Sequence, residues 1–245
     1  MARIDGRANN QLRPTLITPG VQAFAEGSAL IEQGRTKIIC TVSVEEKVPR
    51  FLRGTGRGWI TAEYAMLPRS TSTRTPRDSF LGRTGGRNQE IQRIIGRSLR
   101  AITSLDALGE ISLIVDCDVL QADGGTRTAA ITGSYVALVQ AVEALMKKKM
   151  LPFNPLRSAV AAVSVGAVQG EVLLDLCYEE DFHAEVDFNV AMTSAGRFVE
   201  VQGTAEEKPF SGETMDALLG LARVGIKELF KVQDKALKNL KGGDK

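Results

Sequence analysis

The sequence predicts an α+β fold in which strand-hairpin blocks pack with helices. Two stretches, residues 15–48 and 158–203, alternate apolar and polar positions between turn signals, as antiparallel strands do. Each block is followed by segments whose apolar residues recur at helical spacing. Because no linker or residue-level repeat separates the two blocks, we expect one domain over residues 1–240 and a polar C-terminal tail at 241–245.

The first block begins with strands and ends in a helix. One strand places Ile38, Cys40, Val42 and Val44 on a single face. Residues 50–88 are rich in Gly, Arg, Ser, Thr and Pro, and about half of this stretch is expected to be a long loop. A helix then follows, with Asn88 as its predicted N-cap. Its apolar side comprises Ile91, Ile94, Ile95, Leu99, Ile102 and Leu105.

Further along, residues 111–120 are expected to form a buried strand that leads through a turn at 121–127 into a second helix over 128–146. That helix is apolar almost all round, which predicts a central position in the fold. In the second block, hairpins are predicted around 169–170 and 194–196. An amphipathic helix with Ser211 as its N-cap closes the fold.

The residue inventory excludes several classes of protein. No run approaches the roughly 18 consecutive apolar residues of a membrane span, and the first residues form no apolar signal core, so we expect a cytoplasmic protein without a membrane partner. The three cysteines are far apart and form no Cys-x-x-Cys pair, which argues against a disulfide framework or a zinc ribbon. His183 is the only histidine, which excludes a histidine-clustered metal site within one chain. Neither a P-loop nor a dinucleotide-binding glycine pattern is present.

Positive charge is concentrated between Arg50 and Arg100. This segment contains eleven arginines, no lysine and three acids, a net charge of +8, whereas the whole chain carries +2. Planar guanidinium groups fork onto phosphates and stack on bases, so the segment indicates a polyanionic partner. The alternative is a surface belt of ion pairs between subunits.

Two glycine pairs stand where a turn enters a predicted helix. The run 123–127, Asp-Gly-Gly-Thr-Arg, precedes the second helix, and the run 85–87, Gly-Gly-Arg, precedes the first. Unpaired backbone N–H groups and the helix dipole favour a bound anion at such positions, so inorganic phosphate would fit between Arg87 and Arg127. Alternatively, the glycine pairs make tight turns and the arginines cap neighbouring carbonyls.

Seven acids and no Lys or Arg lie between Glu171 and Asp187. Their oxygens suit a divalent ion better than a soft metal. Asp181 and Asp187 are six positions apart, about 20 Å in an extended strand, so sharing an ion requires the chain to turn back between them. The alternative is a solvated acidic loop.

Several stretches, taken in order, resemble the bacterial ribonuclease PH family: residues 3–7, 58–68, 85–87, 121–133, 181–187 and 201–206. The resemblance covers nearly the whole chain. It implies a ribonuclease PH-like catalytic domain with the activity of a phosphate-dependent 3′ to 5′ exoribonuclease that trims the 3′ ends of transfer RNA. Such an enzyme releases nucleoside diphosphates and, in reverse, adds nucleotides.

The resemblance also implies roles for individual residues. The residues that would hold the attacking phosphate are Arg87, Gly125, Thr126 and Arg127. The catalytic acids Asp181 and Asp187 would bind Mg²⁺, or another divalent ion, or handle protons. The arginines that would hold the RNA are Arg57, Arg69, Arg74 and Arg77. Family members assemble as homohexamers, trimers of dimers, which we expect here too.

Two other functions compete with this one. A catalytically silent RNA-binding ring subunit of a processing complex would share the fold, but it predicts damaged acids or a missing phosphate arginine. In this chain Arg87, Arg127, Asp181 and Asp187 are all present. A small-molecule phosphotransferase that uses the Gly-Gly-Thr-Arg turn for a nucleotide phosphate would leave the positive segment unexplained and would lack a P-loop lysine.

Overall fold

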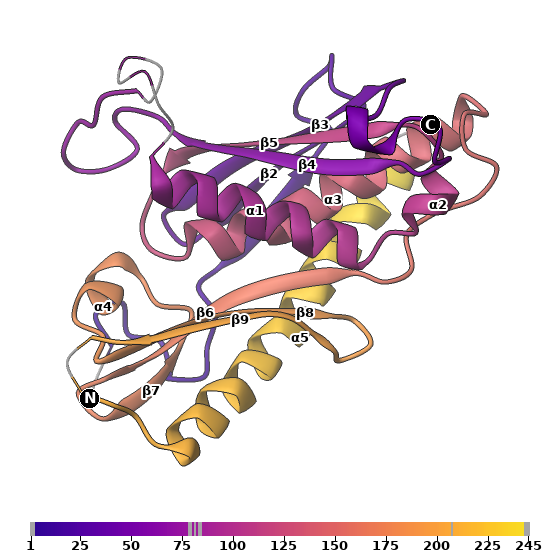
Figure 1. Cartoon of the computed structure of the whole chain (residues 1–245). Coiled ribbons are helices and arrows are strands. Elements are labelled where there is room, and N and C mark those ends of the chain that lie inside the picture. The colour runs from indigo at the N-terminus through magenta and orange to yellow at the C-terminus, as the bar shows by residue number, and fades with distance from the viewer. Residues whose placement is uncertain (1–2, 78–79, 81, 83–84, 207, 243–245) are drawn as a thin grey trace.

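The computed structural model describes residues 3–77, 80, 82, 85–206 and 208–242, and two sheets with their covering helices make up the molecule (Figure 1). The five-stranded sheet has the order β1-β2-β3-β5-β4 and the four-stranded sheet the order β7-β6-β8-β9. The first sheet consists of β1 (Thr15–Pro19), β2 (Gly27–Gln33), β3 (Thr36–Glu45), β4 (Trp59–Met66) and β5 (Ser112–Gln121). The second consists of β6 (Val160–Val168), β7 (Glu171–Leu174), β8 (Val186–Thr193) and β9 (Phe198–Ala205). Both predicted strand blocks and the α+β class are confirmed.

In the first sheet, buried and less buried residues alternate along the strands, as β3 shows. Ile38, Cys40 and Val42 are fully buried along β3, while the residues between them are only half-buried, so the predicted apolar face is confirmed. The pairs β1–β2, β2–β3 and β3–β5 are antiparallel, and β4 pairs with β5 in parallel. Helix α3 (Thr126–Lys147) packs on β2 and β3, and α1 (Gly86–Ala101) packs on β4.

Strand β6 lies between the two hydrophobic cores and is buried on both faces. Val160 and Ala162 belong to the core that α3 and the first sheet form. Ala161, Val163 and Val165 point the other way, into the core under α5 (Gly212–Gly242). A nearly continuous apolar run is the pattern expected for a strand covered on both sides. The strands and α3 therefore hold the two sheets in a fixed relation.

The helix starts differ from the predicted ones. The Gln89 N–H donates to the Gly85 oxygen at 3.1 Å, so α1 begins at Gly86 with Gly85 as its N-cap, and the predicted N-cap Asn88 is wrong. Glycine serves as an N-cap through its backbone alone, which a search for capping side chains passes over. The helix ends at Ala101, and Leu105 opens the separate short helix α2 (Leu105–Leu108).

Two further boundaries bear on the function and on the tail. Helix α3 begins at Thr126 rather than 128, which places Thr126 and Arg127 in its first turn. Ser211 is confirmed as the cap of α5, because its Oγ accepts the Thr214 N–H at 3.2 Å. That helix continues to Gly242, and residues 243–245 of the predicted tail lie outside the described residues. The hairpins at 169–170 and 194–196 are confirmed, and the fold also contains a 3₁₀ turn (Arg50–Leu52) and the short helix α4 (Tyr178–Phe182).

Helix α3 alone, in the described part of the chain, is long and apolar enough to cross a membrane by length and composition. Of its most apolar window, 67% is buried inside the molecule. Since both sheets pack against it, the helix has the surroundings of a core helix, as its all-round apolar sequence predicts.

Candidate active site

The turn between β5 and α3 is built on two glycines. Gly124 and Gly125 have φ angles of +75° and +64°, in the left-handed region that glycine enters without steric cost. A Cβ atom at position 124 would lie 2.5 Å from the Leu176 oxygen, so only glycine permits this contact. The turn therefore rests directly on the backbone that leads into α4, the helix that carries Asp181.

The first turn of α3 is fixed from the first sheet. Thr126 is buried, and its Oγ1 accepts a hydrogen bond of 2.8 Å from the Tyr64 hydroxyl on β4. Burial raises the pKa of Tyr64, which keeps its phenol protonated and able to donate. The start of the helix is thus anchored beside the position where an anion would meet its free N–H groups.

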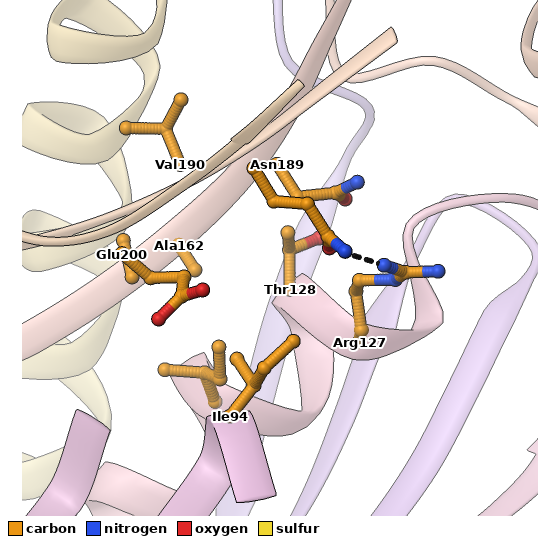
Figure 2. A pocket seen from close by; sticks show the side chains of 10 residues that line it. Ile94, Arg127, Thr128, Ala162, Asn189, Val190 and Glu200 are labelled. Carbon is orange, nitrogen blue, oxygen red and sulfur yellow. Dashed lines mark hydrogen bonds between the residues drawn. The ribbon is translucent and has the colours of Figure 1, made fainter. Parts of the chain in front are cut away.

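Arg127 is held in place by a chain of side chains. Its Nη1 donates to the Gln202 Oε1 of β9 at 2.5 Å, and the Gln202 Nε2 donates to the Glu90 Oε1 of α1 at 2.5 Å. Figure 2 shows Arg127 at the edge of a small pocket between α1, α3 and the second sheet, with Ile94 and Val190 among its apolar residues. Arg127 is therefore positioned by three elements that are far apart in the sequence.

Arg87 lies in the first turn of α1, and its guanidinium is exposed, with Nη1 3.9 Å from the Met66 sulfur. Burial raises the pKa of Asp181, and the positive charges of Arg127, Arg87 and Arg13 oppose that rise. Arg87 and Arg127 thus act electrostatically on the same carboxyl. The structure brings the two predicted phosphate arginines, from two helix starts, to one side of the molecule.

The two predicted catalytic acids also come together. Asp181 lies on the short helix α4 and Asp187 on β8, so the chain between them is not a single extended strand. The pKa of Asp187 is raised by burial and then by the charge of Asp181, while Arg127 opposes the shift. Mutual repulsion of this kind means that the two carboxyls lie within electrostatic range of each other and of Arg127.

A divalent ion fits these two carboxyls with help from other ligands. Within the described ranges, no group of three or more His, Cys, Asp or Glu side chains could hold a metal ion. Mg²⁺ needs only one or two carboxylates when waters and substrate phosphates supply the remaining oxygens. The donor chemistry of Asp181 and Asp187 therefore suits Mg²⁺ as part of a complex with substrate.

The geometry agrees with the comparisons to known proteins. Residues 11–142 match the 3′ exoribonuclease family, domain 1, and residues 158–225 match the 3′ exoribonuclease family, domain 2. The chain belongs to the 3′ exoribonuclease family. The resemblance to ribonuclease PH is thereby confirmed, and the two matched parts coincide with the two sheets.

Individual relatives extend the family match over the whole chain. The ribonuclease PH proteins of two strains of Dehalococcoides mccartyi are each 60% identical over 233 residues, which cover 95% of this chain and 97% of theirs. Among solved structures, rice (Oryza sativa) Rrp46 has a TM-score of 0.78 at 21% identity, covering 96% of this chain and 100% of that one. An Archaeoglobus fulgidus exosome with RNA bound to the active site has a TM-score of 0.80 at 22% identity, covering 94% and 91%. The two structures show that the fold is shared.

The predicted RNA arginines are not all at the same end of the first sheet. Arg69, Arg74 and Arg77 are exposed in the loop after β4, beside the start of α1 (Figure 1). Arg57 precedes β4, whose eight residues span about 26 Å, and its Nε pairs with Asp106 at 2.8 Å. Arg57 is therefore separated from the other three arginines and from Arg87 at the start of α1.

Several supporting residues were assigned no role from the sequence. Tyr64 and Gln202 lie in stretches that carry the family resemblance, but their roles depend on contacts with partners 62 and 75 positions away. For Tyr64 a signal exists, because a tyrosine on the inward face of a strand needs a partner for its hydroxyl. For Gln202 the sequence contains no such signal, since a glutamine is equally compatible with an exposed edge strand.

Proposed function

We propose that this chain shortens RNA from its 3′ end by phosphorolysis and acts on the 3′ ends of transfer RNA. The observation that carries the proposal is the meeting of two helix starts, each with an arginine, and a pair of aspartates at one place in a chain of this family. A site with cations on one side and carboxyls on the other suits a reaction between two phosphates.

The reaction requires one anion to approach another. An oxygen of inorganic phosphate attacks the last phosphorus of the RNA, and the bond from that phosphorus to the 3′-oxygen breaks. A nucleoside diphosphate leaves, and the 3′-oxygen of the shortened chain takes up a proton. Because a phosphoanhydride forms as the diester breaks, the enzyme also adds nucleotides from diphosphates.

The residues of the chain then have complementary tasks. Arg87 and Arg127, with the N–H groups of the Gly124-Gly125 turn and the first turn of α3, bind phosphate and offset its charge. Asp181 and Asp187 would hold a divalent ion such as Mg²⁺, which would supply positive charge near the departing oxygen. Arg69, Arg74 and Arg77 bind the RNA backbone near the 3′ end.

The assembly and the location of the protein are part of the same proposal. We propose a homohexamer, a trimer of dimers, in the cytoplasm. The mass of the protein in solution, measured by light scattering, tests the assembly, because six copies of 26.4 kDa differ from two or one.

The decisive experiment follows the products. Purified protein, Mg²⁺ and a transfer RNA with a few extra 3′ nucleotides are incubated with and without inorganic phosphate, and released nucleotides are separated by chromatography. Diphosphates that appear only with phosphate support phosphorolysis, and an Arg127→Ala variant should then need more phosphate. Monophosphates without phosphate would indicate hydrolysis, and tight RNA binding without products would favour the silent ring subunit.

A further inference from the structure

The turn between β5 and α3, which is proposed to bind phosphate, accepts hydrogen bonds from a buried arginine. Arg13 is 3% exposed. Its Nη1 donates to the backbone carbonyl oxygen of Asp123, and its Nη2 lies 3.5 Å from the backbone carbonyl oxygen of Gly124. Thr36, which is fully buried, adds a second support. Its Oγ1 donates to the same Gly124 oxygen at 2.7 Å and accepts the Asp123 N–H at 3.0 Å.

Arg13 itself is locked in one orientation by Asp175. The carboxylate accepts the Arg13 Nη2 at 2.6 Å, the Nε at 3.1 Å and the backbone N–H at 2.8 Å, and Asp175 is only 1% exposed. Asp175 also has a φ of +56°, which is costly for a residue other than glycine. This costly backbone conformation places the carboxylate 2.6 Å from the Arg13 Nη2 and 3.7 Å from the Nη1 of a second buried arginine, Arg7. The shorter contact and the three hydrogen bonds to Arg13 indicate that the orientation of Arg13 matters.

The direction of these bonds sets the direction of the amides. In a trans peptide the C=O of one residue and the N–H of the next point opposite ways. Because the oxygens of Asp123 and Gly124 face Arg13 and Thr36, the N–H groups of Gly124 and Gly125 face away from them. No hydrogen bond among the described residues uses either N–H. These two donors remain available on the side where α3 begins.

We propose that Arg13 and Thr36 are positioning residues for the phosphate site. They turn the two peptide units of residues 123–125 so that their N–H groups face the bound anion, and they do so without touching it. The proposal rests on the proposed function, because phosphate is the anion in question. Asp175 pairs with the guanidinium of Arg13, and the effect proposed for the turn is one of orientation, separate from the charge that Arg13 exerts on Asp181.

Phosphate binding without RNA gives the first measurement. Inorganic phosphate is titrated into the wild-type protein and an Arg13→Lys variant by calorimetry. A lysine keeps the charge beside Asp175 but cannot bond the carboxylate and two carbonyls in one plane. Loss of about one charge-assisted hydrogen bond on the turn should weaken phosphate binding about tenfold.

The kinetic measurement separates positioning from general loss of structure. In Arg13→Lys, the KM for phosphate should rise by about the same factor, while the KM for RNA and kcat at saturating phosphate stay within about twofold. Arg7→Lys is the matched control, because Arg7 is buried in the same ion cluster but does not contact the turn. Its Nη2 donates to the backbone oxygen of Asp175 at 3.1 Å, and its Nη1 lies 3.7 Å from the Asp175 carboxylate. This control should bind phosphate as the wild type does.

A second variant guards against misfolding. Thr36→Val keeps the volume and removes the bonds to Gly124 and Asp123 while leaving the Arg13 pair intact, so it should weaken phosphate binding about threefold to tenfold. Wild-type affinity in the folded Arg13→Lys protein, or in Thr36→Val if the first variant does not fold, overturns the inference. Equal changes for phosphate and RNA also overturn it.

Failure of the inference is distinguishable from failure of the proposed function. If the wild-type protein releases no diphosphates with phosphate, or if Arg127→Ala binds phosphate unchanged, the proposed function fails. If the wild type is active and Arg127→Ala is impaired but Arg13→Lys matches the wild type, only the positioning role fails.

Discussion

Replacing Gly124 with alanine tests how the two sides of the site are joined. The new Cβ would lie 2.5 Å from the Leu176 oxygen, 2.7 Å from the Cys177 carbonyl carbon and 2.9 Å from the Tyr178 nitrogen. These are backbone atoms and cannot rotate away. The turn must therefore move off the segment that leads into α4, or that segment must move with it.

The free-energy cost of Gly124→Ala has two parts, which a control variant separates. A left-handed φ costs alanine about 1–2 kcal/mol relative to glycine, and crowding against fixed atoms adds about 1–3 kcal/mol. Gly170 has nearly the same φ, +76° against +75°, and no atom within 4 Å of its Cβ position. Gly170→Ala therefore measures the first part alone, and Gly124→Ala should be destabilised by about 1–3 kcal/mol more.

Thermal unfolding and phosphate titration together provide the assay. For a chain of this size each kcal/mol lowers the midpoint by about 2–4 °C, so Gly124→Ala should melt several degrees below Gly170→Ala. It should also bind phosphate on the order of tenfold more weakly, whereas Gly170→Ala should not differ from the wild type. Equal melting points for the two variants, with wild-type phosphate affinity in Gly124→Ala, would refute the close contact between turn and α4.

Three further outcomes are expected. Asp187→Asn should lower kcat by about 10²-fold or more while RNA binding, measured by fluorescence anisotropy, is retained; near-normal turnover would remove Asp187 from the chemistry. Joint replacement of Arg74 and Arg77 by alanine should weaken RNA binding and reduce its salt dependence by about two charges without changing the KM for phosphate; equal effects on both substrates would contradict an RNA role. Burial raises the pKa of Glu180, but the hydrogen bonds from Arg3 and from the Cys177 N–H, with the charges of Arg3 and Arg7, outweigh it and lower the pKa below the ordinary 4.5. The ionised carboxylate therefore stabilises the native state above the ordinary glutamate pKa, and that contribution is lost as pH falls through the lower native pKa. Glu180→Gln should accordingly lose stability at pH 7 and differ less from the wild type as the pH falls below 4, as denaturant unfolding will show.

Helices and strands whose own residues show a clear hydrophobic pattern were predicted correctly from the sequence. Strict alternation located β3, and an all-round apolar sequence placed α3 at the centre, because both depend only on which faces are buried. Helix α4 was missed, since five residues with three acids give no periodicity. Its formation depends on the buried Glu180, whose carboxylate is held by Arg3, 177 positions away.

The site residues likewise divide into those that a local sequence pattern predicts and those whose role depends on partners far away in the sequence. The Gly-Gly-Thr-Arg run was recognisable because a glycine turn at a helix start is a local feature with a chemical consequence. The approach of Asp181 to Asp187 was only a condition for sharing an ion, since it depends on how α4 turns the chain. Arg13 showed no signal, because its partners Asp175 and Asp123 lie 162 and 110 positions away and an arginine near a chain start is usually a surface residue.

The partner of Arg127 explains how the site keeps its positive charge available. An arginine beside two aspartates would lose much of its attraction for phosphate if it paired with either of them. In the described part of the chain, the hydrogen bond that orients Arg127 goes instead to the neutral amide of Gln202. The charge of Glu90 lies on the far side of that amide, so it fixes the amide without contacting the guanidinium. A hydrogen bond to a neutral amide orients Arg127 without neutralising its charge. Among the residues that the structure describes, no further hydrogen bond occupies the remaining donors of Arg127, so they can meet an anion that the aspartates repel.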